Sequence, residues 1–287
     1  MTRPKIYDCF PFFNELDLLE IRLNYLDPVV DYFVLCESKV TFSGISKKLF
    51  YEDNKELFKK FEDKIIHVVV DDTPSELIGV DPFRTDQYQR NSVIKGLQNC
   101  SDNDIIITSD LDELPNINVI KNFKKFYKPD ILFHLAQGMY YYYFNLKETS
   151  GKLLSYSGEF DGIEDKKWLG TKICNYGFLK KYGVDRLRHP SMRESGLRID
   201  NGGWHFTYVG CHKLSSAHER VMLKIGCTSH QEFNNTYYKS HVQVNIKNNK
   251  DVFFRDSNFE VVDMDETFPS YILKNKEKYK HLIKEKV

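Results

Sequence analysis

Short apolar runs alternate with helical patterns over the first 135 residues. Apolar, β-branched or aromatic runs predict strands at 6–10, 32–36, 65–70 and 105–108. Leucines spaced for one helix face follow the first run and predict a helix with Asn14 as its N-cap, and a second helix is expected from a Thr85 cap to Leu97. This alternation predicts an α/β fold with a mostly parallel central sheet flanked by helices.

The second half of the chain is less regular. An unbroken aromatic run occupies 140–144, and residues 150–170, rich in Gly and Ser, predict a long loop. The other predicted elements are a helix of about ten residues after Pro115, a strand at 131–135, a strand interrupted at Gly202 and Gly203, a helix from Ser215 and a basic amphipathic helix at 269–287. No internal repeat or long linker is present, so a single domain over 1–287 is expected.

Composition excludes several classes of protein. The 287 residues carry 41 Lys and Arg against 41 Asp and Glu, and 21 Phe, 18 Tyr and 2 Trp, which excludes a disordered chain and argues against a nucleic-acid binder. No apolar run reaches the roughly 18 residues of a membrane span, and no signal peptide precedes the first strand. A cytoplasmic protein without a transmembrane segment is therefore expected. Six scattered cysteines predict buried thiols.

Two carboxylates follow the most apolar strand. Asp110 and Asp112 come directly after 105–108, and Glu113 follows them. The Asp-x-Asp spacing alone decides nothing, because it also occurs at 102/104 and 263/265. The position of the pair after a strand is informative, because ligands of open α/β sheets bind at the carboxyl ends of strands. Carboxylates there suit Mg²⁺ or Mn²⁺ and, through the cation, a diphosphate, although an acidic turn before a helix is the simpler alternative.

Such a site suits a reaction in which a nucleoside diphosphate leaves. The cation neutralises charge that grows on the leaving phosphate, and a carboxylate or His elsewhere accepts the proton of the incoming hydroxyl. Glycosyl transfer from a nucleotide sugar is a reaction of this kind.

Several segments carry a family resemblance. The segments are 8–23 (with Pro-Phe-Phe-Asn-Glu), 30–44 (with Cys-Glu-Ser), 88–90 (Tyr-Gln-Arg), 109–115 (Ser-Asp-Leu-Asp-Glu-Leu-Pro), 203–206 (Gly-Trp-His-Phe), 229–232 (Ser-His-Gln-Glu) and the tail from 269 (Pro-Ser-Tyr-Ile-Leu). In this order they resemble glycosyltransferase family 17, which includes β1,4-mannosyl-glycoprotein β1,4-N-acetylglucosaminyltransferases.

The resemblance implies a fold of GT-A type, a UDP-sugar donor, which is UDP-GlcNAc in the eukaryotic members of the family, a divalent cation and inversion at the anomeric carbon. A glycan or glycoprotein would be the acceptor. Residues 1–135 would form the nucleotide-sugar-binding half and residues 136–287 the acceptor-side half. The N-terminal membrane anchor and stem of the eukaryotic enzymes are not expected in this chain, so their Golgi location and N-glycan acceptor are not carried over to it.

The resemblance also suggests residue roles. Asp110 and Asp112 are expected to form the metal–diphosphate site, with Asp112 the direct ligand, and either His205 or His230 as a further ligand. The alternative for each histidine is a structural role. The residues expected at the nucleotide are Asn14, Glu37, Ser38 and Arg90, with Arg90 pairing with the diphosphate. Each of these residues has an alternative role. Asn14 could only cap its helix, Glu37 could be a surface carboxylate, and Arg90 could form a structural ion pair.

The remaining roles concern the acceptor side. Asp200 and Glu232 are the candidates for the catalytic base, with Glu159 third. Trp204, after two glycines, could stack on a sugar ring, and alternation along the aromatic run would place Tyr141 and Tyr143 together on an acceptor groove, or in the core.

Two other functions would use part of the same set of residues. A metal-dependent sugar-nucleotide hydrolase or nucleotidyltransferase would need the same acidic pair. A non-catalytic carbohydrate-binding protein would use the aromatic residues but not Asp110 and Asp112.

Overall fold

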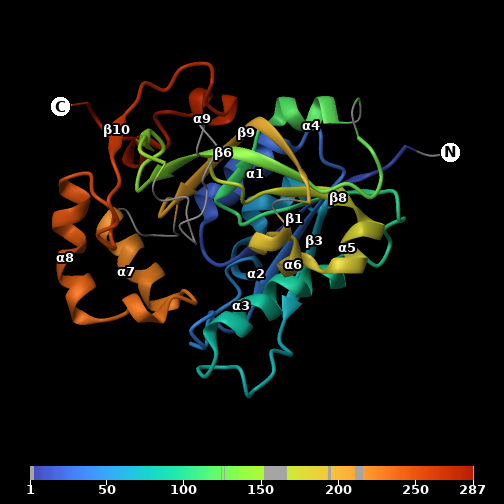
Figure 1. The fold of residues 1–287 in the computed structure, drawn as a ribbon, viewed down its shortest axis with the longest axis horizontal. Coiled ribbons are helices and arrows are strands. Elements are labelled where there is room, and N and C mark those ends of the chain that lie inside the picture. The colour runs from blue at the N-terminus through green and yellow to red at the C-terminus, as the bar shows by residue number, and fades with distance from the viewer. Residues whose placement is uncertain are drawn as a thin grey trace.

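One mixed β-sheet runs through the chain. The computed structural model describes residues 3–123, 125, 127–151, 167–192, 195–210 and 216–286. Over these residues the strand order is β10-β7-β6-β8-β4-β1-β2-β3, and β9 pairs with β5 and β6. The strands β3, β2, β1 and β4 are parallel, whereas β8, β7 and β10 join antiparallel. The predicted α/β fold with helices on both sides of a central sheet is confirmed (Figure 1).

The bounds of the elements are as follows. The strands are β1 (Ile6–Phe12), β2 (Tyr32–Ser38), β3 (Ile65–Val70), β4 (Ile105–Thr108), β5 (Glu113–Pro115), β6 (Phe133–Tyr141), β7 (Leu146–Glu148), β8 (Lys172–Asn175), β9 (Leu197–Thr207) and β10 (Phe259–Val261). The α-helices are α1 (Leu16–Leu26), α2 (Phe50–Asn54), α3 (Pro82–Asn91), α4 (Ile117–Phe123), α5 (Tyr176–Tyr182), α6 (Val184–Arg188), α7 (Ala217–Cys227), α8 (Thr236–Lys247) and α9 (Ser270–Lys274). Short 3₁₀ helices are η1 (Lys55–Phe61), η2 (Ser92–Gly96), η4 (Pro190–Met192), η5 (Gln231–Phe233) and η6 (Lys280–Leu282).

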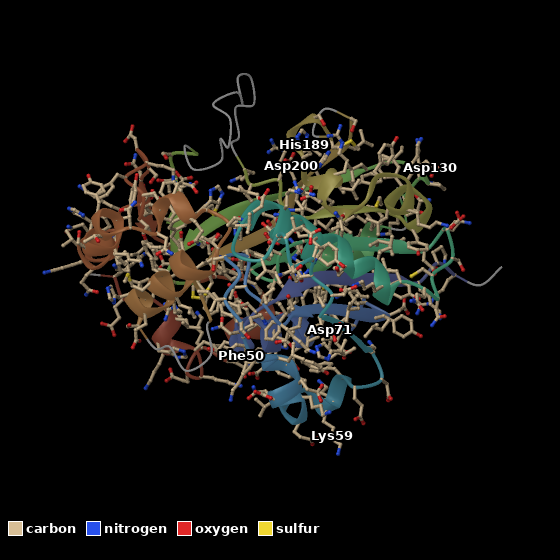
Figure 2. The ribbon with its side chains drawn as sticks, turned by 90° about the horizontal axis from the view of Figure 1, so that it is seen from below. Phe50, Lys59, Asp71, Asp130, His189 and Asp200 are labelled. Carbon is tan, nitrogen blue, oxygen red and sulfur yellow. The ribbon has the colours of Figure 1, made fainter. Side chains whose placement is uncertain are left out.

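Alternation along the parallel strands divides the core into two layers. In β2, Phe33 and Leu35 face a cluster that includes side chains of α1, η1, α4 and α9, whereas Val34 and Cys36 face a cluster with side chains of η2, α5 and α6. β4 is buried at all four positions, as a central strand covered on both faces must be. Charged side chains such as Lys59 of η1 point outward (Figure 2). The predicted division between residues 135 and 136 falls within β6.

A third hydrophobic cluster joins α7 and α8 to the ends of β6 and β9 (Figure 1). The fully buried Arg220 of α7 donates hydrogen bonds to the carbonyls of Tyr208 and Tyr142, at 2.8 Å each. Both tyrosines have positive φ, 63° and 62°. Their backbone conformations are costly for residues with a Cβ, so the buried guanidinium stabilises the two turns at which β6 and β9 end.

Two helix starts differ from the sequence predictions. α1 begins at Leu16 with Glu15 as its N-cap residue and without a side-chain cap, while the buried Asn14 Oδ1 has no hydrogen-bond partner among the described residues. α3 begins at Pro82, because Asp81 caps it by accepting from the Arg84 N–H at 3.0 Å. Proline at the first position of a helix lacks only an N–H that would have no partner there. The Asn14 and Thr85 caps are therefore wrong.

Two predictions for the second half are also wrong. The aromatic run is not a continuous strand, because β6 ends at Tyr141 and Tyr142 turns the chain. The C-terminal segment is not one amphipathic helix but the short α9 followed by η6, with Tyr279 and Leu282 buried. Within the part of the chain that the structure describes, no helix has the length and hydropathy needed to cross a membrane.

The close contact of β5 with β9 gives a stability prediction. Gly203 has a φ of 131°, and a Cβ there would lie 2.1 Å from the Leu114 carbonyl oxygen. We expect Gly203→Ala to lower the free energy of unfolding by about 3 kcal/mol, because strain and a backbone clash add. Gly226, inside α7 with no atom near its added Cβ, is the matched control. Gly226→Ala should raise stability by about 0.5–1 kcal/mol in urea unfolding. Equal stabilities of the two variants would contradict this explanation.

Candidate functional site

The main cavity lies at the carboxyl ends of the parallel strands. Its volume is about 490 Å³. Residues after β1, β2 and β4 line one part of it, and residues of β6, β9, α7 and the 253–255 segment line another. The lining includes Asp110 and Asp112 together with five cationic side chains, Lys47, Arg90, Arg188, Lys224 and Arg255. This is the position at which open α/β sheets bind ligands.

A buried arginine holds the acidic turn at the end of β4. Arg22 of α1 is fully buried and forms a two-pronged ion pair with Asp8 of β1, at 2.6 and 2.7 Å. The same guanidinium donates to the Ser109 hydroxyl at 2.6 Å. It also donates to the carbonyls of Asp110, Leu111 and Glu113, at 3.1, 3.2 and 2.9 Å. The turn therefore takes its shape from an ion pair below it, which leaves its side chains available to the cavity.

Asp110 lies between two arginines. Arg90 of α3 and Arg188 of α6 both form ion pairs with its carboxylate, the latter at 3.0 Å. Burial alone would raise the pKa of Asp110, but the two guanidinium groups lower this pKa to about 2. Arg90 also contacts Asp86 at 2.6 Å. Asp110 is therefore an anion at neutral pH, and it orients two arginines at the cavity.

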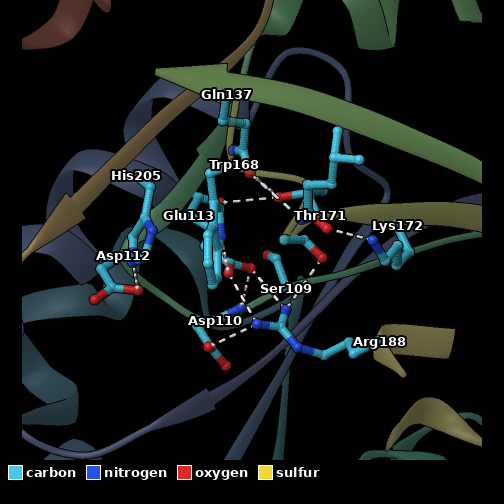
Figure 3. A network of polar contacts seen from close by, with 12 residues as sticks. Ser109, Asp110, Asp112, Glu113, Gln137, Trp168, Thr171, Lys172, Arg188 and His205 are labelled. Carbon is cyan, nitrogen blue, oxygen red and sulfur yellow. Dashed lines mark hydrogen bonds and ion pairs between the residues drawn. The ribbon is translucent and has the colours of Figure 1, made fainter. Parts of the chain in front are cut away.

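Glu113 holds Arg188, the backbone of Asp110 and Trp168 together by hydrogen bonds (Figure 3). Its buried carboxylate accepts from Arg188 at 2.8 and 2.9 Å and from the Asp110 backbone N–H at 2.8 Å. It also accepts from the Trp168 indole N–H at 2.6 Å. Trp168 packs against His205, with ring centroids 4.9 Å apart. Glu113 thus positions an arginine and an indole, and does not itself line the cavity.

Asp112 faces a histidine and a lysine. Its Oδ1 lies 3.5 Å from His205 Nε2 (Figure 3). Its Oδ2 accepts from Lys224 Nζ at 3.0 Å. Burial opposes ionisation of Asp112, yet Lys224 and His205 hold the pKa of its carboxyl well below the usual range. β5 and β9 bring Asp112 and His205 together, because Glu113 is paired with His205 across these strands.

Asp112 and His205 could hold a divalent cation, because the carboxylate oxygen and the imidazole nitrogen that lie 3.5 Å apart are both donors to such ions. Among the described residues no three His, Cys, Asp or Glu side chains form a metal-binding group. The protein would therefore supply two donors, and phosphate oxygens and water the others. A mixed carboxylate–imidazole pair favours Mn²⁺ over Mg²⁺.

The predicted nucleotide residues separate into two groups. Arg90 and Asp110 line the cavity, whereas Asn14, Glu37 and Ser38 do not. Glu37 is fully buried, where it accepts from the Tyr51 N–H at 3.2 Å and faces His67 at 3.2 Å. Its surroundings are those of a structural carboxylate. The neighbours of Asn14 in sequence, Phe13 and Glu15, line the cavity instead, and burial raises the pKa of Glu15.

The predicted bases lie outside the cavity lining. The Asp200 side chain is 69% exposed and pairs with Arg198 (Figure 2). Glu232 is 52% exposed, but its Oε1 lies 2.6 Å from Nδ1 of His230, which does line the cavity. Glu159 lies outside the described residues. The two predicted metal histidines are thus separated: His205 meets Asp112, and His230 meets Glu232.

The predicted acceptor residues divide in the same way. Trp204 is buried in the core against Tyr25, with ring centroids 6.1 Å apart, and it does not line the cavity. Tyr141 does line it, and its hydroxyl accepts from Arg255 at 2.8 Å. Tyr143 is absent from the lining, because the turn at Tyr142 ends the alternation on which the prediction depended.

Several cavity residues were not predicted from the sequence. They are Glu15, Asp86, Trp168, Arg188, Lys224, Phe253 and Arg255. Glu15 stands in the segment 8–23 that carries the family resemblance, and this is the one signal that could have indicated it. The others lie in helices or loops remote in sequence from Asp110, and no local sequence pattern marks them.

The chain matches the sequence profile of glycosyltransferase family 17 over residues 1–286. It therefore belongs to glycosyltransferase family 17.

Two curated relatives are β-1,4-mannosyl-glycoprotein 4-β-N-acetylglucosaminyltransferases. The Rattus norvegicus protein is 26% identical over 223 residues, and the Homo sapiens protein 27% identical over 226 residues. Each match covers 71% of this chain and 41% of the relative, so the chain spans about two fifths of their length.

Two solved structures are also similar. The mannosyltransferase PcManGT of Pyrobaculum calidifontis, in complex with GDP-Man and Mn²⁺, has a TM-score of 0.41 at 10% identity, over 77% of this chain and 61% of its own. Glucosyl-3-phosphoglycerate synthase of Mycobacterium tuberculosis, in complex with Mn²⁺, UDP and phosphoglyceric acid, has a TM-score of 0.38 at 12% identity, over 78% of each chain.

Removal of Arg22 tests its role beneath the site. We expect Arg22→Met to lower the free energy of unfolding by about 3–5 kcal/mol, because it leaves Asp8 as an unpaired buried charge. Arg3→Met is the control, since the Arg3 side chain is 69% exposed and pairs with Asp31. Its loss should cost less than about 1 kcal/mol. Urea unfolding measures both, and similar losses in the two variants would show that the buried pair is not special.

Proposed function

We propose that the protein is an inverting, metal-dependent glycosyltransferase that moves GlcNAc from UDP-GlcNAc to a hydroxyl of a glycan acceptor. Membership of the family and the names of the curated relatives support the reaction class and the sugar. The single observation that carries the mechanism is the meeting, in one cavity, of the Asp112–His205 pair with Arg90, Arg188 and Lys224.

The positively charged side chains of the cavity are suited to bind a diphosphate. Arg90 and Arg188 present planar guanidinium groups, which bind phosphate with two hydrogen bonds each, and Asp110 and Glu113 fix their orientation. Lys224 is held by Asp112, and this carboxylate raises the lysine pKa well above its usual value against the effect of burial. It therefore stays protonated. In the proposed complex these three groups bind the donor phosphates and favour departure of UDP.

The proposed cation site is Asp112 with His205. A bound Mn²⁺ would supply positive charge to the diphosphate as its bond to the sugar breaks. The residues around the pair hold its geometry. Trp168 packs on the His205 ring, and Glu113 fixes Trp168 by its indole N–H.

The proposed base is His230, positioned by Glu232. The 2.6 Å contact of the carboxylate with Nδ1 orients the imidazole, and His230 lines the cavity that also holds the donor site. The other nitrogen would accept the proton of the attacking hydroxyl, as in other carboxylate–imidazole pairs. This proposal keeps Glu232 in the role of a positioning residue. Asp200 has no such link to the cavity lining.

Replacement of one carboxylate tests the donor site. We expect Asp112→Asn to slow UDP release from UDP-GlcNAc in the presence of Mn²⁺ and an acceptor panel by at least about 100-fold, because the cation loses its charged ligand. Asp263→Asn is the matched control: it alters another Asp-x-Asp triplet, and its side chain is 81% exposed. Full activity of Asp112→Asn would overturn the site. UDP release that needs no acceptor would favour a hydrolase.

The two histidines give a second test. His205→Asn should weaken Mn²⁺ binding, measured by electron paramagnetic resonance, by at least about 10-fold, whereas His230→Asn should bind Mn²⁺ normally. His230→Asn should instead slow transfer by about 100-fold or more at saturating donor, as expected for loss of a general base. If His230→Asn lost the metal, or kept normal transfer, the assignment of roles would be wrong.

A further inference from the structure

A path of aromatic rings leads from the cavity to the surface. Neighbouring rings along it have centroids 4.0–6.0 Å apart, except where Phe254 follows Phe253 in the chain. The rings of this aromatic path, in spatial order, are Phe83, His230, Phe233, Phe253, Phe254 and Tyr237. Phe83, His230 and Phe253 line the cavity, and Phe254 and Tyr237 lie beyond its lining.

The outer rings are unusually exposed. Tyr237 is 61% and Phe254 45% accessible, although both are large aromatic residues. At the cavity end Phe83 is 48% accessible. Contiguous exposed aromatic surface of this kind marks a binding site more often than isolated exposed residues do.

The backbone holds Phe254 in place at a cost. Its φ is 60°, a left-handed conformation in which a residue with a Cβ is strained by about 1 kcal/mol or more. The buried Asp251 fixes this turn, because its carboxylate accepts from the backbone N–H groups of Phe253 and Arg255, at 2.8 and 3.1 Å. It also pairs with the Arg255 guanidinium at 2.7 Å. The left-handed backbone conformation would favour glycine at position 254, yet the chain has there a phenylalanine whose ring packs on Tyr237, Tyr238 and His241 and stays 45% exposed.

We propose that the aromatic path is the binding track for an oligosaccharide acceptor. The C–H face of a pyranose ring is apolar and weakly positive, and it stacks on the negative face of an aromatic ring. The hydroxyls at the edge of the sugar stay in water or meet polar groups such as the Tyr237 hydroxyl. Continuity with the cavity selects this occupant, because the path passes His230 and a sugar on it extends toward the donor site.

This inference rests on the proposed function but adds a separate site. Neither Phe254 nor Tyr237 belongs to the lining of the cavity that holds the proposed cation and diphosphate residues, so donor binding and acceptor binding are expected to respond to different substitutions. Two variants test the outer end, Phe254→Gly and Tyr237→Ala. Phe254→Gly relieves the strained backbone, so its Tm should equal or exceed that of the wild type. Loss of binding could then not be attributed to unfolding.

The probes are chitotriose, mannotriose and cellotriose, titrated into the full chain with ligand-observed NMR. We expect the wild type to bind at least one of them and each variant to bind it about 3- to 10-fold more weakly, as for loss of one aromatic stacking partner. Leu57→Ala is the control, because Leu57 is 70% exposed on η1 and does not line the cavity. It should bind as the wild type does.

Binding of UDP with Mn²⁺, measured in parallel, separates the two proposals. Loss of trisaccharide binding in Phe254→Gly and Tyr237→Ala, with unchanged UDP binding, supports the track. The track is overturned if the wild type binds none of the three sugars or if neither variant weakens binding. It is also overturned if the wild type dimerises in sedimentation and Phe254→Gly abolishes the dimer, since a second copy of the chain would then cover these rings. Absence of UDP binding alone would count against the proposed function and not against the track.

Discussion

The buried ion pair of Arg22 with Asp8 is the constraint on which the site depends. Arg22 comes from α1 and Asp8 from β1. The guanidinium of Arg22 also donates hydrogen bonds to backbone carbonyls of the turn after β4. Burial favours protonation of Asp110 and Asp112, yet both have low pKa values, because Arg90 and Arg188 pair with Asp110 and because Lys224 and His205 face Asp112. Arg22 fixes the backbone of the turn, and the cationic side chains at the cavity keep its two carboxylates ionised.

The same physical arrangement recurs at the other half of the cavity. Arg220 is also fully buried and also donates to carbonyls at strand ends, those of Tyr142 and Tyr208. One arginine thus fixes the end of β4 and another fixes the ends of β6 and β9. Since both halves contribute to one cavity, the two sets of strand ends determine the distance between the proposed donor and acceptor sites.

The first half of the fold could be predicted from sequence, and much of the second could not. The strands at 32–36 and 105–108 were predictable because parallel strands buried on both faces are apolar throughout, and the partly buried strand at 65–70 was predictable from its β-branched residues. The aromatic run was wrongly predicted to be a continuous strand with alternating side chains. The buried Arg220 of α7, which is remote in sequence, stabilises a turn at Tyr142 instead. The place of Asp110, Asp112 and Arg90 at the cavity was predictable from position and resemblance. Trp168, Arg188 and Lys224 were not, because only tertiary structure brings them to the cavity.

The central claim is that Asp112 and His205 hold a cation that binds together with the nucleotide diphosphate. The most direct measurement is a calorimetric titration of the full chain with UDP-GlcNAc, once with saturating Mn²⁺ and once with EDTA. If the cation bridges protein and phosphate, UDP-GlcNAc should bind at least about 10-fold more tightly with Mn²⁺, and by linkage Mn²⁺ should bind more tightly with the nucleotide present. Equal affinity for UDP-GlcNAc in Mn²⁺ and in EDTA would contradict it.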